Sequence, residues 1–108
     1  MLAANDPMAI GAAEALKAAN RKALVVGINA SREVIEFDKS GEILGSGDYN
    51  GFDQGCLATE IAIRNLRKQP TPKEIILKPI VMDKANYQDY GTPLEERRCP
   101  KVDSAAGH

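Results

Sequence analysis

The chain has 108 residues and a formal net charge of −1, and 44% of its residues are hydrophobic. This length favours a single domain with a modest core. Lys and Arg form no run longer than two residues and Trp is absent, so a nucleic-acid surface is not expected. No apolar run reaches the roughly 18 residues of a membrane-spanning helix, so the chain is not expected to be embedded in a membrane.

The first elements are expected to be the end of a strand followed by a helix. Residues 2–4 have the apolar character of the last piece of a strand. Asp6 is a good N-cap, and Pro7 suits the first helical position because its missing N–H would be unpaired there in any case. The pattern predicts a helix from Pro7 to about Asn20, with an alanine-rich face that can lie close against a sheet.

Two strands with a short helix between them are expected next. Residues 24–28 form a continuous apolar run, which is typical of a strand covered on both faces in a parallel sheet. The polar segment 29–31 breaks this run, and a short helix is expected over residues 32–39. A second strand is expected over residues 43–48.

The longest helix is expected over residues 51–68, with Asn50 favoured as its N-cap. Residues 74–77 and 80–82 have the composition of extended segments separated by Pro79. Because proline has no N–H to donate, Pro79 is expected at the edge of a sheet or at a point where the chain crosses over.

The alternation of strands and helices predicts an α/β fold with a mostly parallel sheet flanked by helices. The organised part is expected over residues 1–90, and residues 91–108 are expected to form a poorly structured tail. Cys56 lies in the long helix and Cys99 in the tail, and their spacing is not that of a zinc site. Two unpaired thiols are the first expectation, and a disulfide is the alternative.

Several segments occur in an order and spacing that match a known family. They are Asn5-Asp6-Pro7-Met8-Ala9-Ile10-Gly11, Val25-Val26-Gly27-Ile28-Asn29, Asp48-Tyr49, Gln54-Gly55, and the pair formed by residues 72–75 and 81–86. Together they resemble the C-terminal lobe of ribose-type, type I periplasmic sugar-binding proteins of ABC transporters. The resemblance covers residues 1 to about 90. It implies a partial flavodoxin-like lobe, from which the opening units and the whole N-terminal lobe are missing.

Four residues are candidates for ligand binding: Asn5, Asn29, Tyr49 and Asp48. They follow strands, and open α/β sheets bind ligands at the carboxyl ends of their strands. An asparagine amide both donates and accepts hydrogen bonds, as a sugar hydroxyl does. In the resembled family, position 29 is usually aspartate and position 49 is often glutamine. These two departures imply weaker binding or a different ligand.

Each candidate also has a purely structural interpretation. Asn5 could brace the turn before Pro7, Asn29 could accommodate an unusual backbone at a strand end, and Tyr49 could be an ordinary half-buried strand residue. Because successive residues of a strand face opposite sides, Asp48 and Tyr49 are not expected to face the ligand together.

The resemblance implies a non-enzymatic receptor that closes around a small sugar or polyol and so signals an ABC transporter permease. No cofactor or metal is expected. His108 is the single histidine and the last residue, so no Ser–His or Cys–His pair is expected. The alternatives are the sugar-effector domain of a transcription repressor and an inactive fragment. Residues 1–4 lack the basic start of a signal peptide, so the chain as written is expected in the cytoplasm, whereas intact family members are periplasmic.

Overall fold

The computed structural model describes residues 1–106, so His108 lies outside the described residues. Its helices are α1 (Asp6–Ala18), α2 (Ile35–Ser40), α3 (Gly51–Leu66) and α4 (Val102–Ala106), and its strands are β1 (Val26–Ile28), β2 (Gly45–Asp48) and β3 (Ile80–Asp83). Short 3₁₀ turns occupy Arg32–Val34, Tyr87–Tyr90 and Leu94–Glu96. None of the helices in this range is long and apolar enough to cross a bilayer.

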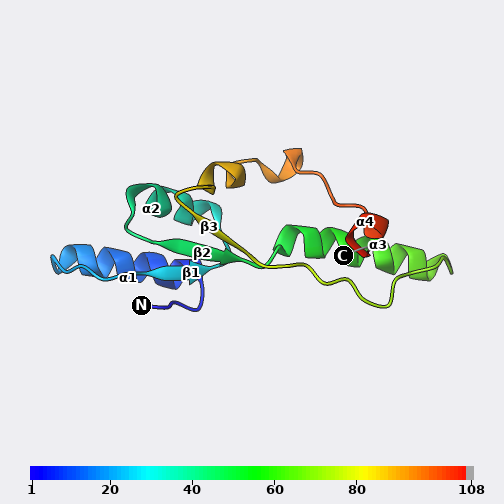
Figure 1. The fold of residues 1–108 in the computed structure, drawn as a ribbon, viewed down its shortest axis with the longest axis horizontal. Coiled ribbons are helices and arrows are strands. Elements are labelled where there is room, and N and C mark those ends of the chain that lie inside the picture. The colour runs from blue at the N-terminus through cyan, green and yellow to red at the C-terminus, as the bar shows by residue number, and fades with distance from the viewer. Residues whose placement is uncertain (107–108) are drawn as a thin grey trace.

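The molecule is elongated and consists of two bodies (Figure 1). It measures 59 × 24 × 21 Å, and its radius of gyration is 17.1 Å. A compact domain of this length would have a radius of gyration of about 13 Å. We call residues 1–48 with 80–90 the sheet body, and α3, residues 75–77 and α4 the helical body. Each body has a hydrophobic core of its own.

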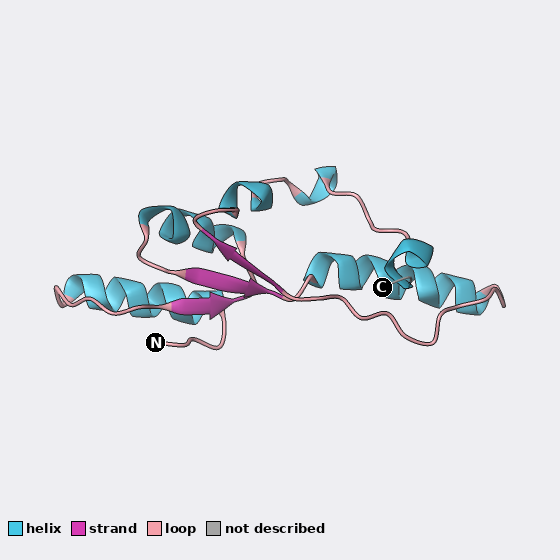
Figure 2. Ribbon diagram, viewed as in Figure 1, coloured by secondary structure: helices cyan, strands magenta, loops and turns pink. Residues whose placement is uncertain are grey.

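The sheet has three strands in the order β1-β2-β3 (Figure 2). Strands β1 and β2 are parallel, with Ile28 level with Gly47, and β3 runs antiparallel to β2 along the other side. A parallel bridge also links Leu2 to Val26. The predicted α/β class is therefore confirmed, although the sheet is mixed. Residues 74–77 form no strand, because the chain there runs along the helical body instead.

Helices cover only one face of the sheet. Gly27, Ser46 and Met82 lie side by side across the strands on the covered face and are buried. Val81 and Ile28 alternate with them and point to the opposite face, where Val81 is 62% exposed. The prediction that residues 24–28 would be covered on both faces is wrong for this chain, because no element in the described range covers the second face.

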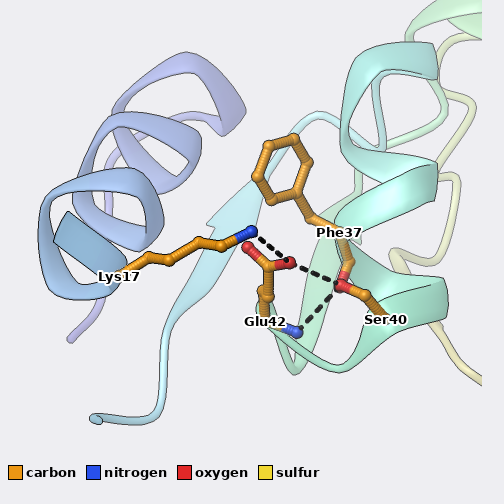
Figure 3. A network of polar contacts seen from close by, with 4 residues as sticks. All are labelled: Lys17, Phe37, Ser40 and Glu42. Carbon is orange, nitrogen blue, oxygen red and sulfur yellow. Dashed lines mark hydrogen bonds and ion pairs between the residues drawn. The ribbon is translucent and has the colours of Figure 1, made fainter. Parts of the chain in front are cut away.

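A small polar network joins the end of α1 to the turn after α2 (Figure 3). Lys17 reaches from α1 to Glu42, with Nζ and Oε1 3.9 Å apart. The Ser40 hydroxyl donates to the Phe37 carbonyl at 3.1 Å and accepts from the Glu42 backbone N–H at 3.3 Å. The Lys17 side chain is largely exposed, so its ion pair contributes little to stability.

The helical body is closed by a disulfide between Cys56 in α3 and Cys99, which corrects the expectation of two unpaired thiols. Its core consists of Leu57 from α3 with Val102 and Ala105 from α4. Helix α4 therefore lies within the segment that was expected to be poorly structured. Sequence spacing could not show this pairing, because it does not reveal that the chain folds back onto α3 after residue 90.

Candidate functional site

The candidate residues all lie at one edge of the sheet. Asn29 directly follows β1, and Asp48 and Tyr49 lie at the end of β2. Because Ile28 is level with Gly47, Asn29 and Asp48 are neighbours across the two strands. Asn5 precedes α1 on the segment that pairs with β1 through Leu2. The edge is thus formed by the carboxyl ends of parallel strands, where open α/β sheets bind ligands.

Asn5 is the N-cap of α1, a position that was predicted for Asp6. Its backbone is extended, with φ −155° and ψ 172°, and its Oδ1 accepts from the Met8 N–H at 3.0 Å. This bond satisfies one of the free N–H groups at the start of the helix. Asn5 therefore does brace the turn before Pro7, which was its alternative, structural interpretation. This role uses only the amide oxygen.

Asn29 and Ala30 have unusual backbone conformations. Their φ angles are 123° and 53°, in a region that L-residues other than glycine seldom adopt. Such a residue costs on the order of 1–3 kcal/mol, and it persists only where the surroundings hold it. The Asn29 N–H donates to the Gly47 carbonyl at 2.9 Å, which extends the parallel pairing beyond β1 and leaves the Asn29 side chain exposed.

A buried carboxylate, which was not predicted from the sequence, holds this loop. Asp6 is 0% exposed. Its Oδ2 accepts from the Ser31 N–H at 2.6 Å, and its Oδ1 accepts from the Ser46 hydroxyl at 2.6 Å. The Ser46 oxygen in turn accepts from the Ala30 N–H at 2.9 Å. The isolated serine in the glycine-rich strand Gly45–Asp48 was the available signal, because a buried hydroxyl requires a partner.

Gly27 leaves the space that the Asp6 carboxylate occupies. A Cβ atom at Gly27 would lie 2.5 Å from Asp6 Oδ1 and 3.1 Å from the Ala9 Cβ. Real Cβ atoms do not come within 3.0 Å of another atom, so a side chain at residue 27 would displace the Asp6 carboxylate from its place beside Ser46. Residues 6, 27 and 46 form one unit that links α1, β1 and β2.

Asp48 and Tyr49 face different surroundings, as strand alternation predicts. The Asp48 carboxylate accepts from the Asn50 N–H at 2.7 Å. Burial, followed by the negative charge of the Asp48 carboxylate, raises the pKa of Tyr90 to about 12. Tyr49 is 49% exposed, and its ring lies beside Gly51.

Asn50 was predicted to be the N-cap of the long helix, and this prediction is confirmed. It stands at the N-cap position in a left-handed conformation with φ 61°, but its side chain makes no capping hydrogen bond. Its side-chain amide instead donates to the Lys78 carbonyl at 2.7 Å. This bond ties together the two segments that cross between the sheet body and the helical body.

A hollow of about 430 Å³ lies where the two bodies meet. Asp48, Asn50 and Phe52 line one side, and Tyr90 and Arg97 of the C-terminal segment line the other. Arg97 holds this segment folded by donating to the Thr92 and Tyr90 carbonyls, and its guanidinium lies 5.7 Å from the centre of the Phe52 ring. Asp48 is the predicted site residue that reaches this hollow; Asn5, Asn29 and Tyr49 are not among its lining residues.

One further carboxyl is buried in the sheet body. Asp38 of α2 is 1% exposed, and both of its oxygens lack a hydrogen-bond partner within the described residues. Burial, together with the negative charges of Asp6 and Asp83, raises the pKa of Asp38 to about 6. The described residues gather no group of His, Cys, Asp and Glu side chains that could hold a metal ion.

No protein-family model matches the chain. Its structure, however, is similar to that of an ABC transporter periplasmic solute binding protein from Actinobacillus succinogenes, solved with bound D-allose. The TM-score is 0.74 at 35% sequence identity, over 82% of this chain and 32% of that one. The Caulobacter myo-inositol binding protein, bound to myo-inositol, matches with a TM-score of 0.74 at 31% identity, over 82% of this chain and 31% of that one.

The chain has the fold of type I periplasmic binding proteins. The predicted resemblance to sugar-binding periplasmic proteins of ABC transporters is thereby confirmed. These neighbours are binding proteins and not enzymes, in agreement with the expected non-enzymatic class. The chain spans about a third of the length of each.

A Mycobacterium smegmatis protein in complex with β-D-fucofuranose has the same fold over more of this chain. Its TM-score is 0.71, over 99% of this chain and 35% of that one. At 22% identity this likeness concerns the fold alone. It extends beyond the 82% that the first two neighbours cover, so the C-terminal segment also has a counterpart in a known fold.

Proposed function

We propose that the chain is one part of a two-lobed sugar or polyol receptor of an ABC importer. In this proposal, Asn5, Asn29 and Tyr49 form one wall of the ligand cleft. The observation that carries it is the polar edge at the carboxyl ends of β1 and β2, on a fold whose solved neighbours hold D-allose and myo-inositol. Neither molecule is assigned to this chain, and both serve as probes.

The chemistry of the edge suits a neutral polyhydroxyl ligand. The Asn5 Oδ1 is used by Met8, and its NH₂ group remains as a donor to a sugar oxygen. The exposed Asn29 amide offers both a donor and an acceptor. Tyr49 offers a ring face for sugar C–H groups and a hydroxyl. Asp48 was the fourth candidate, and we expect it to act from the Tyr90 side and to contribute less.

Uncovered apolar surface supports the proposal that further parts of a receptor complete this chain. Leu24, just before β1, is 72% exposed, and Val81 of β3 is 62% exposed. Leu66 at the end of α3 is 84% exposed. We propose that the missing N-terminal lobe and the remaining units of this lobe cover these residues, and that closure of the two lobes signals the permease.

The disulfide supports an oxidising compartment for the mature protein. Disulfides persist in the periplasm and are rare in the cytoplasm. Cys56 and Cys99 form such a bond here, and the solved neighbour from Actinobacillus succinogenes is periplasmic. We therefore propose that the chain works in the periplasm, as the intact members of the resembled family do.

Titration of the isotope-labelled chain with D-allose and with myo-inositol, followed by NMR, tests the proposed site. One wall of a cleft binds weakly, with a Kd on the order of millimolar or above. We expect saturable shifts of the Asn5, Asn29 and Tyr49 side-chain or backbone signals, and smaller shifts with the Asn5→Ala variant. Asn65→Ala, which removes an exposed amide from α3, is the matched control. The absence of saturable shifts at these positions, or their persistence in Asn5→Ala, would contradict the proposed wall.

A further inference from the structure

The loop after β1 contains two strained residues in succession, yet its backbone N–H groups are bonded to buried atoms. Asn29 and Ala30 both have positive φ angles. The Ala30 N–H reaches the Ser46 hydroxyl at 2.9 Å, and the Ser31 N–H reaches Asp6 Oδ2 at 2.6 Å. Both acceptor residues are no more than 1% exposed. In an exposed turn, water would accept the hydrogen bonds of these N–H groups, and neither contact would be needed.

The hydrogen bonds around Asp6 have one consistent arrangement of protons. Carboxylate oxygens only accept, so the Ser46 hydroxyl must donate to Asp6 Oδ1 at 2.6 Å. The Ser46 oxygen is then free to accept from Ala30. Asp6 thus orients Ser46, and the two side chains together hold successive N–H groups of the loop. A charged acceptor makes such bonds stronger than neutral ones.

We infer that Asp6 is a positioning residue of the ligand site: through Ser46 and Ser31, it holds the loop that presents Asn29. This inference rests on the proposed function for the part that concerns ligand binding. Asp6 directly follows Asn5, so one short segment supplies a candidate ligand residue and the support of a second one. These hydrogen bonds hold residues 29 and 30 in their strained backbone conformation. They therefore fix the position of Asn29 before any ligand binds.

Amide hydrogen exchange of the full chain tests the positioning role without any ligand. We expect the Ala30 and Ser31 N–H groups of the wild-type chain to be protected to a degree comparable with Leu44, whose N–H bonds to Val25 within the sheet body. Exchange at the rate of a free turn in the wild-type chain would overturn the inference directly, even if every variant failed to fold.

Variants separate the role of Asp6 from general stability. Asp6→Asn keeps the shape but replaces one acceptor oxygen with a donor, and Ser46→Ala removes the hydroxyl. We expect exchange at residues 30 and 31 to accelerate at least tenfold relative to Leu44 in both. Ser46→Thr, which retains the hydroxyl, should restore protection, and Asp103→Asn, an exposed position, should leave it unchanged. Equal acceleration at Leu44 would reduce Asp6 to a structural residue and overturn the inference.

The sugar titration of the same variants connects positioning to the ligand. We expect the apparent Kd obtained from the Asn29 shifts to rise at least tenfold in Asp6→Asn. In Asp103→Asn it should equal that of the wild type. Unchanged affinity in Asp6→Asn would overturn the positioning role in binding. If the wild-type chain itself shows no sugar-dependent shift, the proposed function fails, while the exchange data still decide whether Asp6 holds the loop.

Discussion

The sheet body and the helical body are stabilised by different means. The sheet body has a core that includes Val34, Ile43 and Met82, each no more than 1% exposed, and the buried Asp6 network links its elements. The helical body has only Leu57, Val102 and Ala105 as its buried hydrophobic residues, and a disulfide crosses it. A core this small needs a covalent restraint, as small secreted domains generally do.

The difference also concerns function. The candidate ligand residues lie at the edge of the sheet body or, for Tyr49, directly after it, where a rigid scaffold fixes the strand ends. The helical body contributes Phe52 and the surface against which Arg97 lies. We therefore expect changes in the helical body to alter how the bodies are joined, and changes in the sheet body to alter the ligand edge itself.

The largest expected effect comes from removal of the disulfide. The bond closes a loop with a sequence separation of 43 residues, for which loop-closure entropy in the unfolded chain corresponds to about 4 kcal/mol. In a Cys56→Ser/Cys99→Ser double variant, we expect the α3 and α4 amides to exchange faster, while those of the sheet body keep their rates. Addition of a reductant to the double variant is the control and should change nothing. If amide exchange accelerates equally in both bodies, the two bodies are not stabilised by different means.

The next effect in size is expected at Gly27. The methyl group of Gly27→Ala would displace the Asp6 carboxylate, and such overpacking costs about 1–3 kcal/mol. Urea denaturation measures this loss. Gly11→Ala is the matched control, because its Cβ meets nothing within 4 Å and lies in the interior of α1. It should be stabilised by about 0.5–1 kcal/mol, as is usual for glycine replacement within a helix. Similar responses of the two variants would show that Asp6 does not depend on the space at residue 27.

Asp38 is expected to make the sheet body sensitive to pH. Its pKa is raised to about 6 in the folded chain, against an ordinary value of 3.8, so the folded chain holds this proton more tightly than the unfolded one. The stability that the group contributes is fully present below about pH 4 and is lost as the pH rises through 6. Thermal unfolding of Asp38→Asn between pH 4 and 8 should show a flatter pH dependence and a higher Tm near pH 7.5. If the wild-type Tm falls no more steeply between pH 4 and 8 than the Tm of Asp38→Asn, this assignment is contradicted.

The smallest effect is expected from the ion pair between Arg64 and Asp103. Arg64 Nη1 lies 3.2 Å from Asp103 Oδ1, but the Asp103 side chain is 86% exposed. Exposed pairs are screened by water and salt and contribute little. Asp103→Asn should leave the Tm of the chain nearly unchanged at physiological salt. A clear loss of stability would show that α4 is held by this pair and not mainly by the disulfide and Val102.

The sequence was sufficient for the order of the elements and for the polar strand ends, because apolar periodicity and helix-start residues report local structure. It misassigned the N-cap to Asp6, since both Asn5 and Asp6 are good capping residues and only the hydrogen bonds of Asp6 to Ser46 and Ser31 distinguish them. The disulfide was only the alternative expectation, and α4 was not predicted. Both depend on the chain folding back onto α3, which no local pattern between residues 90 and 99 encodes.

The ligand edge itself is tested most directly in a chimera. In it, this chain replaces the matching third of the Caulobacter myo-inositol binding protein, and isothermal titration follows the binding of myo-inositol and D-allose. We expect the folded chimera to bind one of these or a related polyol, and Asn5→Ala to lose about 1–3 kcal/mol of binding free energy, as when a buried polar partner is left unpaired. Asn65→Ala should bind as the parent does. A folded chimera whose affinity is unchanged by Asn5→Ala, or which binds no sugar or polyol, would contradict the account.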